Sequence, residues 1–298
     1  MSERGTASRR WFARALTAAA VVLALTGTTV ADAARAALAP CPTSRYRSAR
    51  TLIIAHASGD WFGPPNTIEM LRASKAAGAD VLDTDVRVTK DGQLVASHDD
   101  VVKVGRVQRS ISRSTLAELR TLDLGDEWAG PRKNFPLRGK AVRVPTVPEV
   151  LAAFPKDLIS MEFKATGGER ALCSLLRSTK RTGDVYIGSA GDAAVDVFAP
   201  LCPEVTTTVT DAMVPTMRAA RQSGAAWCSP SPIGQPPLSR GSTFRLTKES
   251  VDWNHAHGLA VFTWTADTEA SLRFVATLGV DGVYTARADL AKRILNRS

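Results

Sequence analysis

Two aspartates at positions 83 and 85 lie within 81–88, a β-branched run that predicts a strand. Side chains two residues apart on a strand point the same way, so both carboxylates share one face. They repel one another unless a cation lies between them, and Mg2+ or Ca2+ with oxygen ligands is the economical solution. Glu162 and Lys164 share a face of another predicted strand in the same way. The alternative is a polar layer of ion pairs, in which Lys164 neutralises either aspartate.

A turn signal relates His98 to this acidic pair. Residues 90–93, Lys-Asp-Gly-Gln, are typical of a tight hairpin, and Asp-Gly suits a two-residue loop. With residues 91 and 92 as the loop, the numbers of cross-strand partners sum to 183, so His98 faces Asp85. His56 follows the first predicted strand. Two imidazoles beside a metal-bound phosphate suit phosphodiester cleavage, since one accepts a proton from the nucleophile and the other donates one to the leaving alkoxide.

Short β-branched runs alternate with helical patterns along the chain and give about eight β-then-α units. This order predicts an α/β fold, a parallel sheet closed into a (β/α)8 TIM barrel. No G-x-G-x-x-G follows the first strand, which argues against a dinucleotide-binding sheet. Active sites of such barrels form at the C-terminal ends of the strands, where the acidic groups and His56 then converge. The expected strands are 52–55, 81–88, 158–163, 185–188, 205–209, 225–228, 261–264 and 282–285.

Two segments interrupt this alternation. Residues 99–145 are long, basic and loop-rich, and we interpret them as an insertion on the barrel rim. Residues 222–239 are uncharged and full of Ser, Pro and Gly, which predicts a loop around the short expected strand.

The first 36 residues have the order of a secretory signal peptide: a basic start, an uncharged run and then small residues. Residues 8–14 also resemble a twin-arginine signal, and both export routes stay open. A retained anchor is the alternative, although about 17 uncharged residues are few for a span of roughly 20. We expect a cleaved leader at 1–36, an N-terminal extension at 37–50 and the barrel at 51–298. The protein would be secreted or lie in the cell envelope, with no stable membrane span after cleavage.

The composition excludes several classes of protein. Of the 298 residues, 44% are hydrophobic and 22% charged, which rules out bulk disorder, collagen and coiled coil. The formal charge is +9, and loss of five basic and two acidic leader residues leaves +6. No basic stripe is interleaved with aromatic residues, so we expect no nucleic-acid partner. A mild positive field suits anionic substrates such as phosphates or envelope polymers. The sequence indicates no oligomeric state.

Four cysteines, Cys41, Cys173, Cys202 and Cys228, all lie beyond the leader. Two disulfides are expected from three possible connectivities, and buried free thiols are the alternative. We favour Cys173–Cys202, because the two residues flank one βα unit. No C-x-x-C pair is present, which argues against a zinc knuckle.

Taken together, the motifs resemble the glycerophosphodiester phosphodiesterase family, within the phosphatidylinositol-phospholipase-like barrels. The resemblance covers about residues 52–290, and the motifs occur in the family's order. It implies a TIM barrel and a phosphoric diester hydrolase activity. The motifs are His56-Ala57-Ser58, Pro64-Pro65-Asn66-Thr67, Gly78-Ala79-Asp80, Asp83-Thr84-Asp85, Thr89-Lys90-Asp91-Gly92, His98-Asp99, Leu119 to Gly125, Pro145 to Leu151, Glu162-Phe163-Lys164, Trp264-Thr265 and Gly279 to Thr285.

The resemblance also implies roles for individual residues. It assigns an acid/base pair, ligands for a divalent metal, either Mg2+ or Ca2+, and groups that contact the substrate. These are His56 and His98 as the catalytic pair, Asp83, Asp85 and Glu162 as metal ligands, and Lys164, Trp264 and Asn66 as substrate-binding residues.

Three positions depart from the family's pattern. The Arg after the first His is Ala57 here, and the Glu of Pro-Glu-Asn-Thr is Pro65, so a bidentate phosphate clamp and a pocket carboxylate are both missing. The metal ligand that is usually Glu is Asp83, one methylene shorter. Loss of one charged phosphate contact costs roughly 1.5–3 kcal/mol, on the order of ten- to a hundred-fold. Such a loss slows an enzyme but does not necessarily silence it.

The sequence therefore favours a secreted, metal-dependent hydrolase that converts a glycerophosphodiester, or a related lipid or wall polymer, to an alcohol and a phosphomonoester. The altered segment at 56–58 motivates one alternative, a phospholipase-D-like or cyclising enzyme of the same barrel. The missing Arg and Glu motivate another, a barrel that binds phosphate-bearing ligands with little or no turnover.

Overall fold

The computed structural model describes residues 41–189 and 191–295, so the predicted leader lies outside the described residues. Eight parallel strands in the described part form the wall of a barrel, in the spatial order β8, β7, β6, β2, β1, β13, β12, β9. The ends of this order meet where Thr208 and Ile233 form a parallel bridge. The predicted (β/α)8 barrel is therefore confirmed. The wall strands are β1 (Leu52–Ala55), β2 (Val81–Val88), β6 (Leu158–Phe163), β7 (Val185–Ser189), β8 (Thr206–Thr207), β9 (Ile233–Gly234), β12 (Ala260–Thr263) and β13 (Gly282–Thr285).

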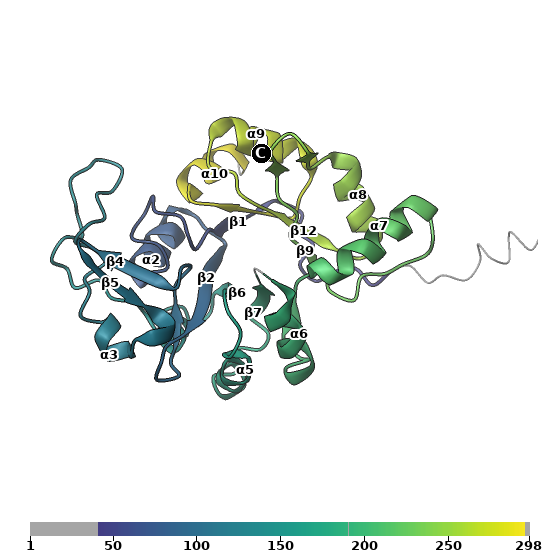
Figure 1. Ribbon diagram of the computed structural model, residues 1–298. Coiled ribbons are helices and arrows are strands. Elements are labelled where there is room, and N and C mark those ends of the chain that lie inside the picture. The colour runs from purple at the N-terminus through teal and green to yellow at the C-terminus, as the bar shows by residue number, and fades with distance from the viewer. Residues whose placement is uncertain (1–40, 190, 296–298) are drawn as a thin grey trace, which may run out of the picture. The chain divides into compact units, whose positions relative to one another are not determined.

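Helices follow most wall strands and pack outside them, as α5 and α6 do beside β6 and β7 (Figure 1). Helix α2 shows why such elements form where they do. The Thr67 hydroxyl caps its first turn by accepting from the Met70 amide at 3.2 Å, and Gly78, at φ 112°, ends the helix. The helices are α2 (Ile68–Ala77), α3 (Leu116–Leu119), α4 (Val147–Ala153), α5 (Glu169–Ser178), α6 (Asp192–Leu201), α7 (Val214–Ser223), α8 (Lys248–Ala256), α9 (Glu269–Leu278) and α10 (Ala288–Leu295).

Aromatic side chains fill part of the barrel interior. Tyr186, Phe262 and Tyr284 come from three different wall strands and form one buried cluster, so they project inward. Tyr46, which precedes the first strand, packs edge-on against Tyr186 with ring centroids 5.7 Å apart. This interior is a packed core, which leaves the carboxyl ends of the strands to hold polar groups.

The hairpin formed by β2 and β3 (Leu94–Ala96) has a different register from the predicted one. Val86 pairs with Ala96 and Val88 with Leu94, so partner numbers sum to 182 and Asp85 lies opposite Ser97, not His98. The prediction of a two-residue loop is wrong, because the loop has three residues, 90–92, closed by a bond from the Thr89 amide to the Gln93 carbonyl. Glycine at the third loop position, with φ 78°, is typical of a type I turn followed by a bulge.

The 99–145 segment, predicted as a loop-rich insertion, contains regular structure. Strands β4 (Val101–Val104) and β5 (Val107–Ser110) form an antiparallel hairpin, followed by a 3-10 turn at Ile111–Arg113 and by α3. A smaller hairpin, β10 (Ser239–Arg240) and β11 (Phe244–Arg245), follows β9.

The predicted strand at 225–228 is wrong. That segment has no regular structure, and the wall position belongs to β9, inside the Ser-, Pro- and Gly-rich run that predicted a loop. Cys228 is instead bonded to Cys41, and Trp227 stacks on Trp253 with centroids 5.9 Å apart, which holds the segment outside the wall.

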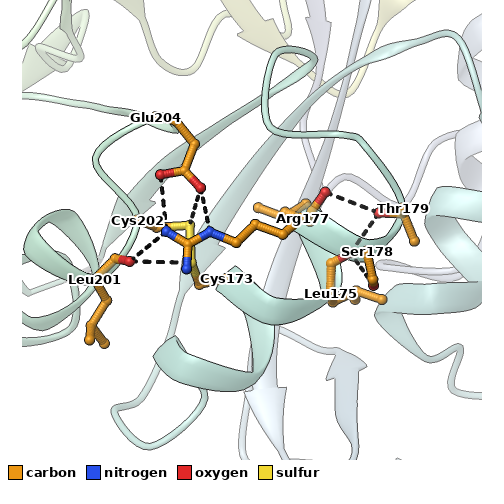
Figure 2. Close-up of a disulfide and its surroundings, with 9 residues drawn as sticks. Cys173, Leu175, Arg177, Ser178, Thr179, Leu201, Cys202 and Glu204 are labelled. Atoms are coloured by element: carbon orange, nitrogen blue, oxygen red, sulfur yellow. Dashed lines mark hydrogen bonds and ion pairs between the residues drawn. A yellow bond between two sulfur atoms is a disulfide. The ribbon is translucent and has the colours of Figure 1, made fainter.

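Both disulfides of the described chain are formed, and the favoured Cys173–Cys202 pairing is confirmed. It joins α5 to the end of α6. Figure 2 shows the Arg177 guanidinium beside this disulfide, donating to the Leu201 carbonyl at 3.0 Å and to the Glu204 carboxylate. In the described residues, no helix has both the length and the apolar character that crossing a membrane requires.

Candidate active site

A cavity of about 530 Å³ opens at the carboxyl ends of the wall strands and collects most of the predicted site residues. Six of the eight line it. They are His56, Asp83, His98, Glu162, Lys164 and Trp264. The remaining two, Asp85 and Asn66, do not line it and are hydrogen-bonded to one another. The cavity also takes in Tyr284 and two side chains from the β9–β11 region, Gln235 and Arg240.

Parallel pairing of β2 with β6 brings the acidic side chains together. Asp85 is the register partner of Glu162, and Asp83 that of Ser160. Asp83 is 3% exposed and Asp85 2% exposed, whereas the Glu162 side chain is 33% exposed. The Asp83 carboxylate accepts from the Ala57 amide at 3.0 Å, which ties β2 to the segment after β1.

Lys164 forms ion pairs with two of the three acids. Its Nζ lies 3.1 Å from Asp85 Oδ1 and 2.7 Å from Glu162 Oε1. Burial lowers the pKa of this ammonium, but the charges of Asp85 and Glu162 outweigh burial and raise the pKa. The ion-pair interpretation that the sequence left open therefore describes Lys164, Asp85 and Glu162 in this structure.

Asp83 differs from its neighbour because it has no cationic partner among the described ion pairs. Burial, together with the negative charges of Asp85 and Glu162, raises the pKa of the Asp83 carboxyl to about 8. Hydrogen bonds from the Ala57 amide and from Ser160 act in the opposite direction but do not cancel the shift. The site therefore concentrates more negative charge than its own cations balance.

His56 directly follows β1, and its half-buried imidazole lines the cavity. Burial lowers the pKa of His56, and the Lys164 charge adds to this effect, against the opposing charges of Asp85 and Asp267. The ring is therefore held in its neutral form near pH 7, in which it accepts a proton.

His98 reaches the same cavity from the segment after β3, although the hairpin register differs from the prediction. Its side chain is 48% exposed, and Nδ1 lies 2.9 Å from Asp99 Oδ1. The Arg87 guanidinium donates to the His98 carbonyl at 2.9 Å, which fixes the backbone there. The structure thus places one half-buried and one exposed imidazole around the same cavity.

Trp264 lies at the rim, 41% exposed, and its indole N–H donates to the Gln235 carbonyl at 2.8 Å. On the floor of the cavity, the Gln235 amide group donates to the Tyr284 hydroxyl, which also bonds to Tyr186 at 3.0 Å and Ser160 at 3.1 Å. Burial raises the pKa of Tyr284 well above its ordinary value, so this hydroxyl stays protonated.

Asn66 does not line the cavity. Its amide group donates to Asp85 Oδ2 at 2.7 Å, and its carbonyl oxygen accepts from the Asp85 amide at 2.8 Å. It is 3% exposed, with φ 58°, a left-handed conformation that asparagine tolerates better than most residues. Asn66 therefore positions Asp85, a role that sequence spacing alone did not indicate.

The two departures from the family pattern occupy different environments. Ala57 is 1% exposed and contributes its backbone amide to Asp83. Pro65 is exposed and lines a second cavity of about 320 Å³, which shares only His98 with the first. Neither residue supplies a charge to the catalytic cavity.

The donor set fits a hard divalent cation in its chemistry. Asp83, Asp85 and Glu162 offer carboxylate oxygens, and the raised pKa of Asp83 is the mark of negative charge that a cation would relieve. The three carboxylates do not converge within 4.8 Å of one another, and Lys164 contacts two of them. The described group that does converge, Cys173, Cys202 and Glu204, has its sulfurs committed to a disulfide.

Arg240 is the cavity residue that sequence reasoning missed most completely. It lies at the end of a two-residue strand, one residue beyond the segment 222–239 predicted as a loop. No local motif surrounds it, so only the closure of the barrel at β9 could bring it to the site.

Comparison with known proteins gives a family match, similar sequences and similar solved structures. The model of the glycerophosphoryl diester phosphodiesterase family matches residues 57–175 and 199–290. A glycerophosphodiester phosphodiesterase of Bacillus subtilis (strain 168) is 27% identical over 262 residues, which cover 82% of this chain and 86% of the relative. The crystal structure of a glycerophosphodiester phosphodiesterase from Agrobacterium tumefaciens C58 has a TM-score of 0.65 at 20% identity, covering 82% of this chain and all of the other. An Oleispira antarctica phosphodiesterase in complex with the product sn-glycerol-3-phosphate has a TM-score of 0.63 at 20% identity, covering 82% and 96%. Both structural likenesses show a shared fold.

Proposed function

Because the chain belongs to the glycerophosphoryl diester phosphodiesterase family, and is thus a phosphoric diester hydrolase, we propose how it works. It is an exported, divalent-metal-dependent enzyme that cleaves a glycerophosphodiester to an alcohol and a phosphomonoester by two-histidine acid/base catalysis. One observation carries this proposal: His56 and His98 line the same cavity as Lys164, Asp83 and Glu162. His56 is half-buried, whereas His98 is exposed.

His56 acts as the general base. Its pKa is lowered by burial, so the imidazole is neutral near pH 7 and takes the proton from the attacking hydroxyl as the new P–O bond forms. The positive charge that this transfer creates faces Asp85 and Asp267, whose charges favour the imidazolium.

His98 acts as the general acid. Its exposed ring stands at the cavity mouth with Asp99 as a partner for the protonated form. It donates a proton to the leaving alkoxide as the P–O bond to the alcohol breaks. With water as the nucleophile, one proton is taken and one given, and the products are an alcohol and a phosphomonoester.

Asp83, Asp85 and Glu162 would hold the divalent metal, Mg2+ or Ca2+, which supplies Lewis-acid stabilisation of charge on the phosphoryl oxygens. Asp85 and Glu162 are also the ion-pair partners of Lys164. A metal on these carboxylates would leave the Lys164 ammonium able to contact a phosphate oxygen in the same cavity.

Export rests on two features of the chain. The predicted leader precedes the described residues, and both disulfides join cysteines beyond it. Disulfides persist in oxidising compartments, which supports a secreted or cell-envelope location.

The test is hydrolysis of a panel of glycerophosphodiesters by the purified protein, with Ca2+, Mg2+ or chelator. We expect metal-dependent release of alcohol and phosphomonoester, reduced about 100-fold or more in His56→Ala and in His98→Ala. His257→Ala is the matched control, because His257 stacks on Trp253 at 3.9 Å and does not line the cavity. The hydrolysis rate of His257→Ala should stay within about two-fold of that of the unmodified protein.

Three outcomes would contradict the proposal in different ways. Turnover that survives both histidine substitutions would remove the acid/base pair. A cyclic phosphate as the final product would point to the cyclising alternative. Binding of sn-glycerol 3-phosphate with no turnover under any metal would leave a ligand-binding barrel.

A further inference from the structure

Arg240 lines the cavity yet is absent from the ion pairs of residues 41–189 and 191–295. Its guanidinium also donates none of the hydrogen bonds found in those residues, and the residue is exposed. The second Lys or Arg of the cavity lining, Lys164, is bound by Asp85 and Glu162. The cavity thus has one committed and one uncommitted permanent cation.

The backbone beneath Arg240 is well fixed. The Leu238 amide donates to the Trp264 carbonyl at 2.7 Å, and the Leu246 amide donates to the Leu238 carbonyl at 3.0 Å. Leu238 and Leu246 are buried in the core behind β12 and β13. On the other side of Arg240, its own carbonyl accepts from the Thr243 hydroxyl at 2.9 Å. Within the described residues the guanidinium is therefore unbonded, but the hairpin that carries it is tied to Trp264, the residue directly after β12.

We propose that Arg240 is the substrate's anion-binding residue: its guanidinium pairs with the non-bridging phosphoryl oxygens of the phosphodiester. It supplies, from the hairpin after β9, a charge that the segment after β1 lacks because position 57 is alanine. The inference rests on the proposed function, since it concerns the ligand of the same cavity. The chemical class of ligand is a phosphate mono- or diester.

The choice of arginine matters for this role. A guanidinium presents parallel N–H donors that match two oxygens of a phosphate, and its charge persists at every pH of interest. Burial holds His56 neutral, and the acids hold Lys164, so neither provides this recognition in the unliganded cavity. Arg240 places its charge at the rim, where an anion arrives.

The test measures binding of sn-glycerol 3-phosphate and of orthophosphate by calorimetry, and KM for the best diester. In Arg240→Ala we expect Kd and KM to rise about ten- to a hundred-fold, with a smaller change in kcat. Arg240→Lys should recover part of the affinity, because it keeps the charge but loses the paired donors. Binding of both probes should become less sensitive to salt in Arg240→Ala.

Arg245→Ala is the matched control. Arg245 lies on the partner strand of the same hairpin, but its guanidinium packs over the Phe274 ring at 4.0 Å, away from the cavity lining. If Arg245→Ala weakens phosphate binding as much as Arg240→Ala, the effect belongs to the hairpin and the proposal is overturned. Unchanged Kd and KM in a folded Arg240→Ala protein would overturn it as well.

The two proposals fail separately. If the unmodified protein hydrolyses no diester, the proposed function fails, while a lost affinity for orthophosphate in Arg240→Ala still supports the anion contact. If hydrolysis proceeds and Arg240→Ala leaves KM and phosphate binding unchanged, only the assignment of Arg240 fails.

Discussion

Asp83 and Asp281 are both buried at an end of the barrel wall, yet their carboxyl pKa values are shifted in opposite directions. Asp83 lies in β2 beside the cavity, where burial and like charges raise its pKa to about 8. Asp281 immediately precedes β13, at the amino ends of the strands. Burial alone would raise the pKa of Asp281, but bonds from His255 and from the amides of Val261 and Ser48 outweigh burial and lower it.

The charge of Asp281 is satisfied by partners within the fold, which stabilises it. The charge of Asp83 is left unbalanced, which suits binding of a cation. Asp281 also accepts from Arg47 at 2.9 Å, so the segment before β1 is bonded to the bottom of the barrel. Every oxygen of that carboxylate has a partner. The cavity end keeps an acid without a cationic partner, a half-buried neutral histidine and an arginine that forms no ion pair within residues 41–189 and 191–295. A phosphate ester and a cation would supply the missing charges.

The largest expected contrast is between His56 and His255. His56→Ala should lower kcat/KM by about 10²–10⁴, since it removes the general base, with little change in unfolding free energy. His255→Ala should cost about 1–3 kcal/mol of stability, because it leaves Asp281 without its 2.8 Å partner, and should leave the rate per folded molecule unchanged. Steady-state kinetics and denaturant unfolding of both variants measure this; equal losses of activity would erase the distinction between the two ends.

Asp281→Ala tests the stabilising end alone. It removes the acceptor of four hydrogen bonds, including the amide of Val261 at 2.8 Å, and leaves the buried donors unpaired. We expect a loss of about 3–5 kcal/mol, as for other broken buried charge pairs. Unfolding by urea gives the value, and Asp252→Ala, whose partner Lys248 is exposed, is the control with an expected change under about 0.5 kcal/mol. A loss for Asp281→Ala as small as the control's would contradict the assigned role.

How far the sequence predicts this molecule depends on whether the signal is local. The strands that carry the site, β1, β2 and β6, follow from short runs rich in β-branched and apolar residues, and their predicted bounds agree with the structure. The acidic residues two apart on β2 therefore share a face as expected. Helix α2 ends at Gly78, because the backbone there adopts a left-handed conformation, which glycine takes up most easily.

The errors arose where long-range packing overrides a local pattern. A three-residue loop in place of a two-residue one shifts the hairpin register by one, and Asp-Gly is compatible with both. The short strand β9 carries too few residues for a periodic signal, and its identity comes from pairing with β12. Arg240 reaches the cavity only through this pairing of β9. The bonds of Asn66 to Asp85 depend on the packing of the segment after β1 against β2, which no spacing rule reveals.

Asp83→Asn should raise the stability of the protein at pH 8 while lowering its metal-supported activity. The folded carboxyl has a pKa raised above its ordinary value, so ionised Asp83 destabilises the fold as pH rises from about 4 to 8. The amide removes that charge, and we expect Tm at pH 8 to rise by roughly 2–4 °C in the absence of metal, equivalent to about 1 kcal/mol. Metal-supported activity should fall at the same time. A lower Tm at pH 8, or an equal gain at pH 4, would show that Asp83 is not an unbalanced charge.

The smallest effect expected is a shift in the pH dependence caused by Asp267. This carboxylate accepts from the Ala286 amide at 2.7 Å and from the Thr285 hydroxyl at 3.1 Å, and its charge raises the pKa of His56. Asp267→Asn keeps an oxygen for both bonds but removes the charge, so the pKa of His56 falls further below its ordinary value. The acid limb of kcat/KM, which reports protonation of the base, should therefore move to lower pH by a few tenths of a unit. An acid limb that moves upward, or that stays fixed while His56→Ala abolishes it, would mean that Asp267 does not act on the base through its charge.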